Sequence, residues 1–205
     1  MSTLSVDKVE PVGSTLTFGE SGDTFVIPTG AIFTNNGTAN GFASGSTHSS
    51  EWRLTTTFAS TIDPIALNLE AVVADVPTTT TTTPSASTAL GDPMVLTTGV
   101  FKFPVTGFWK VSVTSSCSFS GYNAAGAGVI IKFTTNDSTW NDVTTVWAQQ
   151  YLNYHSGSYG SVILKILDVD QDKVSFRYLC VAGGSLIGSA TANASSMSFV
   201  RLGDI

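Results

Sequence analysis

The stretch GVFKFPVTGFWKVSV, residues 99–113, contains two short alternating runs separated by a proline and a Thr-Gly turn. In the first run Phe101 and Phe103 share one side of an extended chain, because successive side chains of a strand point to opposite faces. The proline that follows has no N–H to donate to a sheet, so it predicts the end of this strand. Gly107 supplies the backbone freedom of a turn, and Trp109 begins a second run of alternating apolar residues. We interpret the stretch as a hairpin with an aromatic corner.

The same alternation recurs along most of the chain after residue 50 and is typical of half-buried strands. No segment keeps the i, i+3, i+4 spacing of a helix over three turns, and Gly, Asn, Asp and Ser separate the runs. The expected strands are residues 51–58, 65–73, 99–104, 108–119, 128–135, 143–153, 158–169, 173–183 and 195–203. This pattern predicts an all-β fold, an antiparallel β-sandwich.

The composition restricts the class of protein. Only 12% of the 205 residues are charged, roughly half the share of ordinary soluble domains. The net charge of -6, with nine Lys and Arg in total, argues against binding to nucleic acid or to an anionic membrane surface. No apolar run reaches the roughly 20 residues of a spanning helix, so we expect no membrane insertion. The start MSTLSVDKVE lacks the basic and apolar regions of a signal peptide, which predicts assembly in a cytoplasm.

The length of the apolar runs divides the chain into two regions. Residues 1–47 hold runs of only four or five residues between GESGD, PTG and NNG turns, too little apolar surface for an independent core. We expect an attachment or stem segment there, followed by a head domain at 48–205. The Thr-rich segment 75–93 predicts a long exposed loop, either a passive connector or a loop that contacts a partner.

Three segments of the head resemble a known group of domains. The F-x-F-P-x-T-G-x-W-x-V pattern within 99–113 resembles a strand pair of the jelly-roll heads of complement-type globular domains and the tumour necrosis factor superfamily. DVDQDKVSF (168–176) and MSFVRLGD (197–204) resemble later strands of those heads. The segment GSTLTFGESGDTFVIPTGA (13–31) is similar to stem segments of bacteriophage fibre proteins. The resemblance implies an antiparallel jelly-roll head that assembles as a homotrimer on a short-stranded stem.

The segment YLNYHSGSYG, residues 151–160, is a candidate contact site. Tyr151, Tyr154, His155 and Tyr159 stand there among small polar residues rather than in an apolar run. Aromatic side chains at a solvated rim suit contact with a glycan or a protein. The alternative is an ordinary solvated hairpin, and the tryptophans elsewhere are interpreted mainly as core.

Asp168, Asp170 and Asp172 recur at every second position and form a candidate metal site. Three carboxylates at a strand end, together with backbone carbonyls, suit Ca²⁺, and some of the resembling heads bind calcium. The pattern lacks the Gly and Glu that an EF-hand loop requires at its sixth and twelfth positions. The alternative is a turn with solvated charges, and no other cofactor is predicted.

The residues that could support catalysis are few. His48 and His155 belong to no recognisable nucleophile motif and are expected to face solvent. Residues 71–205 contain no glutamate, which leaves few carboxylates for a paired mechanism. Cys117 and Cys180 lie in phase with the apolar sides of strands and are interpreted as buried free thiols. We predict no enzymatic activity.

These features predict a structural protein on the surface of a phage virion. It would be a trimeric fibre whose head contacts a host-surface glycan or protein, and residues 1–47 would bind another virion protein. The alternative is a capsid decoration or head-fibre protein that stabilises or extends the shell without binding a receptor. Both need an anchor and a trimer, so the two alternatives stay open at the level of the sequence.

Overall fold

The computed structural model describes residues 46–72, 90–120, 126–149, 155–180 and 183–205. The chain divides into residues 1–42, which lie outside the described ranges, and a unit of residues 43–205. The attachment segment predicted at 1–47 therefore lies almost wholly outside the described residues. The strands of the second unit are β1 (Ser49–Leu54), β2 (Leu69–Ala71), β3 (Val95–Thr97), β4 (Val100–Lys102), β5 (Gly107–Phe119), β6 (Gly126–Thr134), β7 (Asn141–Gln149), β8 (His155–Ile166), β9 (Lys173–Cys180), β10 (Gly184–Leu186) and β11 (Ser196–Gly203).

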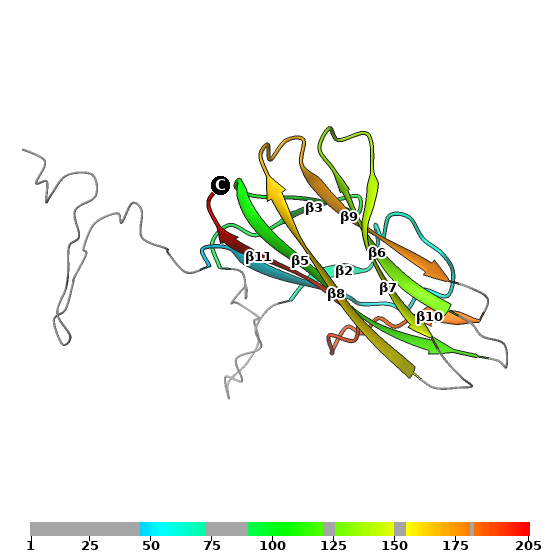
Figure 1. The fold of residues 1–205 in the computed structure, drawn as a ribbon. Coiled ribbons are helices and arrows are strands. Elements are labelled where there is room, and N and C mark those ends of the chain that lie inside the picture. Colours follow the sequence, from blue (N-terminus) through cyan, green and yellow to red (C-terminus); the bar gives the residue numbers. More distant parts are fainter. Residues whose placement is uncertain (1–45, 73–89, 121–125, 150–154, 181–182) are drawn as a thin grey trace, which may run out of the picture. The chain divides into compact units, whose positions relative to one another are not determined.

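The strands form two antiparallel sheets that pack face to face as a sandwich (Figure 1). Sheet A has the order β2, β1, β11, β5, β8. The short strand β10 pairs with the C-terminal end of β5, on the same side of β5 as β11. Sheet B has the order β3, β4, β9, β6, β7. Chain neighbours such as β5 and β6 lie in different sheets, so the chain crosses repeatedly between the two layers. The predicted antiparallel sandwich is confirmed.

The predicted hairpin at residues 99–113 is wrong, because its two strands belong to different sheets. β4 pairs with β3 and β9 in sheet B, whereas β5 pairs with strands of sheet A. The segment between β4 and β5 therefore crosses from one sheet to the other. Phe103 and Trp109, at the two ends of this segment, both lie in the core, with ring centroids 5.2 Å apart. Trp109 Nε1 donates to Val105 O at 3.1 Å and closes this corner. Gly107 has φ 137°, and a Cβ there would lie 2.5 Å from Gly203 O. The glycine prediction is thus confirmed, although the turn joins two sheets.

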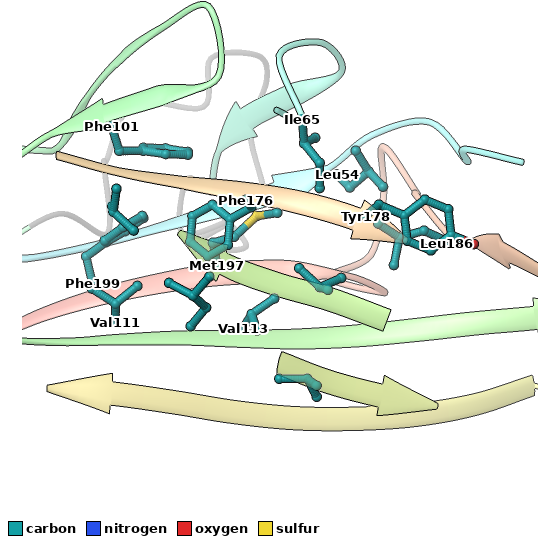
Figure 2. Close-up of a cluster of buried hydrophobic side chains, with 14 of the residues drawn as sticks. Leu54, Ile65, Phe101, Val111, Val113, Phe176, Tyr178, Leu186, Met197 and Phe199 are labelled. Atoms are coloured by element: carbon teal, nitrogen blue, oxygen red, sulfur yellow. The ribbon is translucent and has the colours of Figure 1, made fainter. Parts of the chain in front are cut away.

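The core fills the layer between the sheets, where the labelled side chains of both converge (Figure 2). Phe101 from sheet B packs against Phe199 from sheet A at 4.9 Å between ring centroids, and against Phe176 at 5.7 Å. The alternation within β5 buries one complete face of that strand, as predicted. Its buried apolar members are Trp109, Val111, Val113, Cys117 and Phe119.

Several predicted strands differ from the observed ones in length. The expected strand at 65–73 shrinks to Leu69–Ala71, because the preceding segment is bound to β9 in the other sheet. Ile62 forms an isolated bridge with Tyr178, and Ile65 N donates to Phe176 O at 2.8 Å. β3 and β10 were not expected, since three residues are too few to show an alternation.

The two cysteines are free thiols, as predicted. Cys117 is buried within β5 and Cys180 is half-buried at the end of β9. Burial raises the pKa of Cys117 to about 11, so this thiol is protonated at neutral pH. Cys180 Sγ lies 2.8 Å from Gly184 O and donates to it.

Candidate functional site

The outer surface of sheet A, called here the sheet A face, carries four large, partly exposed side chains at β8 and β5, among small polar residues and lysines, and an ion pair between Arg53 and Glu70 on β1 and β2. Alternation in β8 directs every second side chain outward, so Tyr159 and Ile163 are 59% and 61% exposed. Leu167 continues the row just past the strand and is 64% exposed, and Phe108 projects from β5 beside them. These four large side chains share one surface with small hydroxyl residues. The small residues of this face are Ser112, Thr114, Ser161, Ser196 and Ser198.

Tyr159 is tied to its neighbours on the sheet A face. It stands opposite Thr114 in the register, and its Oη donates to Ser112 Oγ at 3.3 Å. The pKa of Tyr159 lies below its usual value. The main cause is hydrogen bonding to Ser112, followed by hydrogen bonding to Ser161 and Lys110, since these groups stabilise the phenolate. The ring is therefore held along the strand while its edge and face stay accessible.

Two lysines lie on the sheet A face among the apolar side chains. Lys110 is opposite Ile163, and Lys165 is opposite Phe108. Lys165 Nζ lies 6.0 Å from the centroid of the Phe108 ring, within the range of a cation–π interaction. Long lysine stems cover apolar surface while their charged ends stay in water, so these residues are compatible with an apolar face.

The outer surface of sheet B, called here the sheet B face, carries a network of ion pairs. Arg177 of β9 pairs with Asp142 at 2.6 Å and approaches Asp63 to 3.7 Å. Asp63 also pairs with Lys132 of β6 at 2.8 Å. A separate ion pair joins Lys102 of β4 to Asp170 of the β8–β9 turn at 2.6 Å. The four cations of this face, all ion-paired, are Lys102, Lys132, Lys173 and Arg177.

The structure describes two of the four predicted contact residues, His155 and Tyr159. Both belong to β8, which for Tyr159 agrees with the strand expected at 158–169, and both side chains project from the sheet A face. They lie four residues apart, roughly 13 Å along the strand, so they do not form one pocket. Tyr151 and Tyr154 lie outside the described residues. The aromatic contact site therefore stays a prediction.

The three aspartates of the candidate metal site have separate structural roles. Asp172 is buried, and its Oδ2 accepts hydrogen bonds from Leu167 N at 2.6 Å and Asp168 N at 3.0 Å. Asp168 Oδ1 accepts from Asp170 N at 2.8 Å. Asp170 pairs with Lys102, whose hydrogen bond and charge lower the pKa of that carboxyl. These contacts close the turn between β8 and β9, and calcium binding stays a prediction.

His48 is half-buried rather than facing solvent as expected. Its ring lies 6.0 Å from Trp109, and its backbone carbonyl accepts from Arg201 N at 2.9 Å. Arg201 also donates from Nε to Thr106 O at 3.0 Å and from Nη1 to Thr47 Oγ1 at 3.1 Å. These hydrogen bonds join Thr47 and His48, near the start of the described chain, to the last strand, β11.

Trp147 is the exposed aromatic residue that the sequence interpretation assigned to the core. It is 46% exposed on β7, whereas Trp109 is fully buried. Its place on the outer side of the sheet follows from its buried neighbours Val146 and Ala148. The paired strand offers a signal in retrospect, since Gly128 stands opposite this tryptophan.

The described residues include no group of three His, Cys, Asp or Glu side chains arranged to hold a metal ion. Within the same ranges, no helix is long and apolar enough to cross a membrane. The described ranges form a two-sheet sandwich whose two outer faces differ in the side chains they carry.

Comparison with known proteins agrees with this architecture. No protein-family model matches the chain, and no curated protein matches it. Among solved structures, Eiger TNF from S. frugiperda is similar at 14% identity, with a TM-score of 0.54 over 77% of this chain and 93% of that chain. Murine APRIL is similar in crystal structures at pH 8.5 and pH 5.0, at 8% and 9% identity. Their TM-scores are 0.50 and 0.51, over 76% of this chain and 98% of each APRIL chain. The chain therefore has a TNF-like jelly-roll fold, as the sequence resemblance implied.

Proposed function

We propose that this chain is a non-enzymatic structural protein of a tailed-phage virion. It forms a homotrimeric fibre, residues 1–47 attach it to another virion protein, and its jelly-roll head contacts a glycan or protein on the host surface. The observation that best supports this assembly is the difference between the two outer faces of the head: exposed large side chains gather on sheet A, and most ion pairs lie on sheet B. The resemblance of residues 13–31 to phage fibre stems supports the virion location.

The sheet A face is suited to contact with other copies of the head. Its four large side chains are about half exposed on average, and burying such a side chain completely contributes about 1.5–3 kcal/mol. Each copy therefore gains roughly 5 kcal/mol from these residues alone, before hydrogen bonds are counted. The small hydroxyl residues between them allow close approach and supply further donors and acceptors.

The sheet B face is suited to solvent instead. Burying its ion pairs in an interface would remove charged groups from water, at a cost of several kcal/mol for each ion. Charged residues are also depleted at the centres of protein interfaces. Assembly through the sheet A face leaves the charged network outward on each subunit.

A trimer of such heads presents three equivalent outward surfaces on one rigid body. Simultaneous engagement of linked sites raises avidity by about 10²–10⁴ without any new contact. Weak recognition of a repetitive cell surface by each head is then sufficient for adsorption. The TNF-like fold and the sequence resemblance support three as the number of subunits.

Two measurements on the full chain test the proposal. Light scattering should give a mass of about 64 kDa, three times the 21.4 kDa of one chain. The purified protein should also adsorb to host cells and compete with phage particles for them. A monomeric mass would contradict the assembly, and a trimer without adsorption or competition would contradict receptor recognition. Antibody labelling of particles in the electron microscope would then show whether the trimer decorates the capsid.

A further inference from the structure

The sheet A face carries the two lysines of the described chain that have no carboxylate partner. The described ranges contain eight Lys and Arg residues, and six of these form ion pairs. The other two, Lys110 and Lys165, both project from the sheet A face beside its large exposed side chains. An ammonium group that loses its water without gaining an anion is strongly destabilising. A subunit that covers this face should therefore supply a carboxylate.

The two lysines differ in how completely a neighbouring subunit would cover them. Lys165 is next to the last residue of β8 and lies over the Phe108 ring, so its long stem can keep the ammonium group in water at the rim. Lys110 stands between two apolar residues, opposite Ile163 of β8 on one side and Val200 of β11 on the other. Lys110 is therefore the residue that most needs an anion from the covering subunit.

Glu51 of β1 is the carboxylate on the sheet A face that meets this need. It alternates with Trp52, which packs in the core, so Glu51 points outward. Its Oε1 accepts a hydrogen bond of 3.3 Å from Asn193 Nδ2. Glu70, the other strand carboxylate of this face, already pairs with Arg53. Within the described ranges, Glu51 is thus the strand carboxylate of sheet A that has no cationic partner.

Lys110 and Glu51 lie apart within one subunit. Glu51 and Ser112 both stand opposite Ser198 of β11, so two strand spacings separate β1 from β5 at this level. Lys110 lies two residues before Ser112, which puts its Cα atom roughly 12 Å from that of Glu51. Both side chains leave the sheet on the same side, so they lie beside each other rather than face to face.

We propose that Lys110 of one subunit pairs with Glu51 of the next subunit. In a closed ring of identical subunits each contact joins two different parts of the surface, so the β5–β8 flank of the sheet A face meets the β1–β2 flank of the next copy. The β5–β8 flank has a charge of +2 from its two lysines, and the β1–β2 flank has a charge of −1 from two glutamates and one arginine. Complementary charges favour the correct partner and fix the register between subunits. This inference rests on the proposed function and identifies the contact that orients the subunits.

Charge reversal in the full chain tests this contact. The single variants are Lys110→Glu and Glu51→Lys, and a double variant carries both changes. Each single variant should raise the concentration at which half of the chains are trimeric by at least about tenfold, because like charges then meet at every interface. The double variant should restore the wild-type concentration, since it exchanges the two charges. Lys102→Glu is the matched control, because it makes the same charge change on the sheet B face and should leave the trimer intact. Circular dichroism should give the same β-sheet spectrum for all variants.

Chemical cross-linking tests the same contact in the unchanged protein. A carbodiimide forms an amide directly between a lysine amine and a carboxylate that touch each other. The wild type should give covalently joined subunits whose digest contains a Lys110–Glu51 link. Glu51→Gln should lose that link, because an amide does not react with the carbodiimide.

Light scattering and cell adsorption separate the possible failures. Single variants that stay trimeric, or that dissociate without recovery in the double variant, would overturn the contact, as would a trimer that yields no Lys110–Glu51 link. Equal dissociation of Lys102→Glu would also overturn it, since the effect would then follow net charge. Each of these results leaves the proposed function standing if the wild type is a trimer that adsorbs to cells. A monomeric wild type would overturn both, and a cross-linked trimer that does not adsorb would support the contact and overturn receptor recognition.

Discussion

Ile163→Lys should convert the proposed trimer into folded monomers. Ile163 lies on β8, the strand at one edge of sheet A, and is 61% exposed in the single chain. It stands directly opposite Lys110 and two residues from Lys165. A third cation there stays hydrated in a monomer, where like charges across a strand cost only a fraction of a kcal/mol. In the trimer the same ammonium group would be buried without an anion.

The magnitude follows from the exposed fraction. Complete burial of an isoleucine contributes about 1.5–3 kcal/mol, so covering the exposed part of Ile163 contributes about 1–2 kcal/mol for each copy. An unpaired buried ammonium costs several kcal/mol more for each copy. Summed over three subunits the change exceeds about 10 kcal/mol, which no trimer held at micromolar concentration tolerates.

Val95→Lys is a closely matched control. Val95 is also β-branched and 55% exposed, and it also stands directly opposite a lysine, Lys102, but on the sheet B face. Light scattering should give about 64 kDa for wild type and for this control, and 21.4 kDa for Ile163→Lys. Circular dichroism should show the same β-sheet spectrum for all three. An unchanged mass for Ile163→Lys, or equal dissociation of both variants, would refute the assignment of the interface to sheet A.

Three further predictions concern the stability of the head. Arg201→Ala removes the hydrogen bonds from Arg201 to Thr106 O and to Thr47 Oγ1, and should lower the free energy of unfolding in urea by about 2–3 kcal/mol. A loss below about 0.5 kcal/mol would show that these hydrogen bonds do not stabilise the fold. Gly107→Ala should cost about 3 kcal/mol in the same assay, because φ is 137° and the new Cβ would meet Gly203 O, and wild-type stability would contradict that geometry. The Cys117 thiol has a pKa raised from 9.0 to about 11, so the unfolded chain releases this proton first and stability should fall by about 1–2 kcal/mol between pH 9 and pH 11. Cys117→Ala should flatten that slope, and an equal slope in both proteins would show that other groups cause it.

Whether a residue of the candidate site belongs to the core could be predicted in part from its own segment of sequence. Which residues lie beside it could not, because that depends on how distant strands pair. Tyr159 could be singled out as an aromatic residue outside the core, because its neighbours in the sequence are small and polar. Its position on the sheet A face depends on the pairing of β8 with β5, more than 40 residues earlier in the chain. Trp147 was interpreted as core together with the other tryptophans, and the burial of its neighbours Val146 and Ala148 in the structure shows that it lies outside.

The sequence by itself determined which side of β5, and of the segment that begins with β4, is buried. Side chains alternate with a period of two whatever partner a strand has, so Phe101, Phe103 and Trp109 could be assigned to the core from the spacing of their own segment. Only the tertiary structure decided that β4 and β5 belong to opposite sheets, and that most ion pairs gather on one outer face while Tyr159, Ile163 and Phe108 gather on the other. Those properties arise from contacts between segments that are far apart in the sequence, such as the ion pair of Asp63 with Lys132. The local spacing of residues contains no information about such contacts.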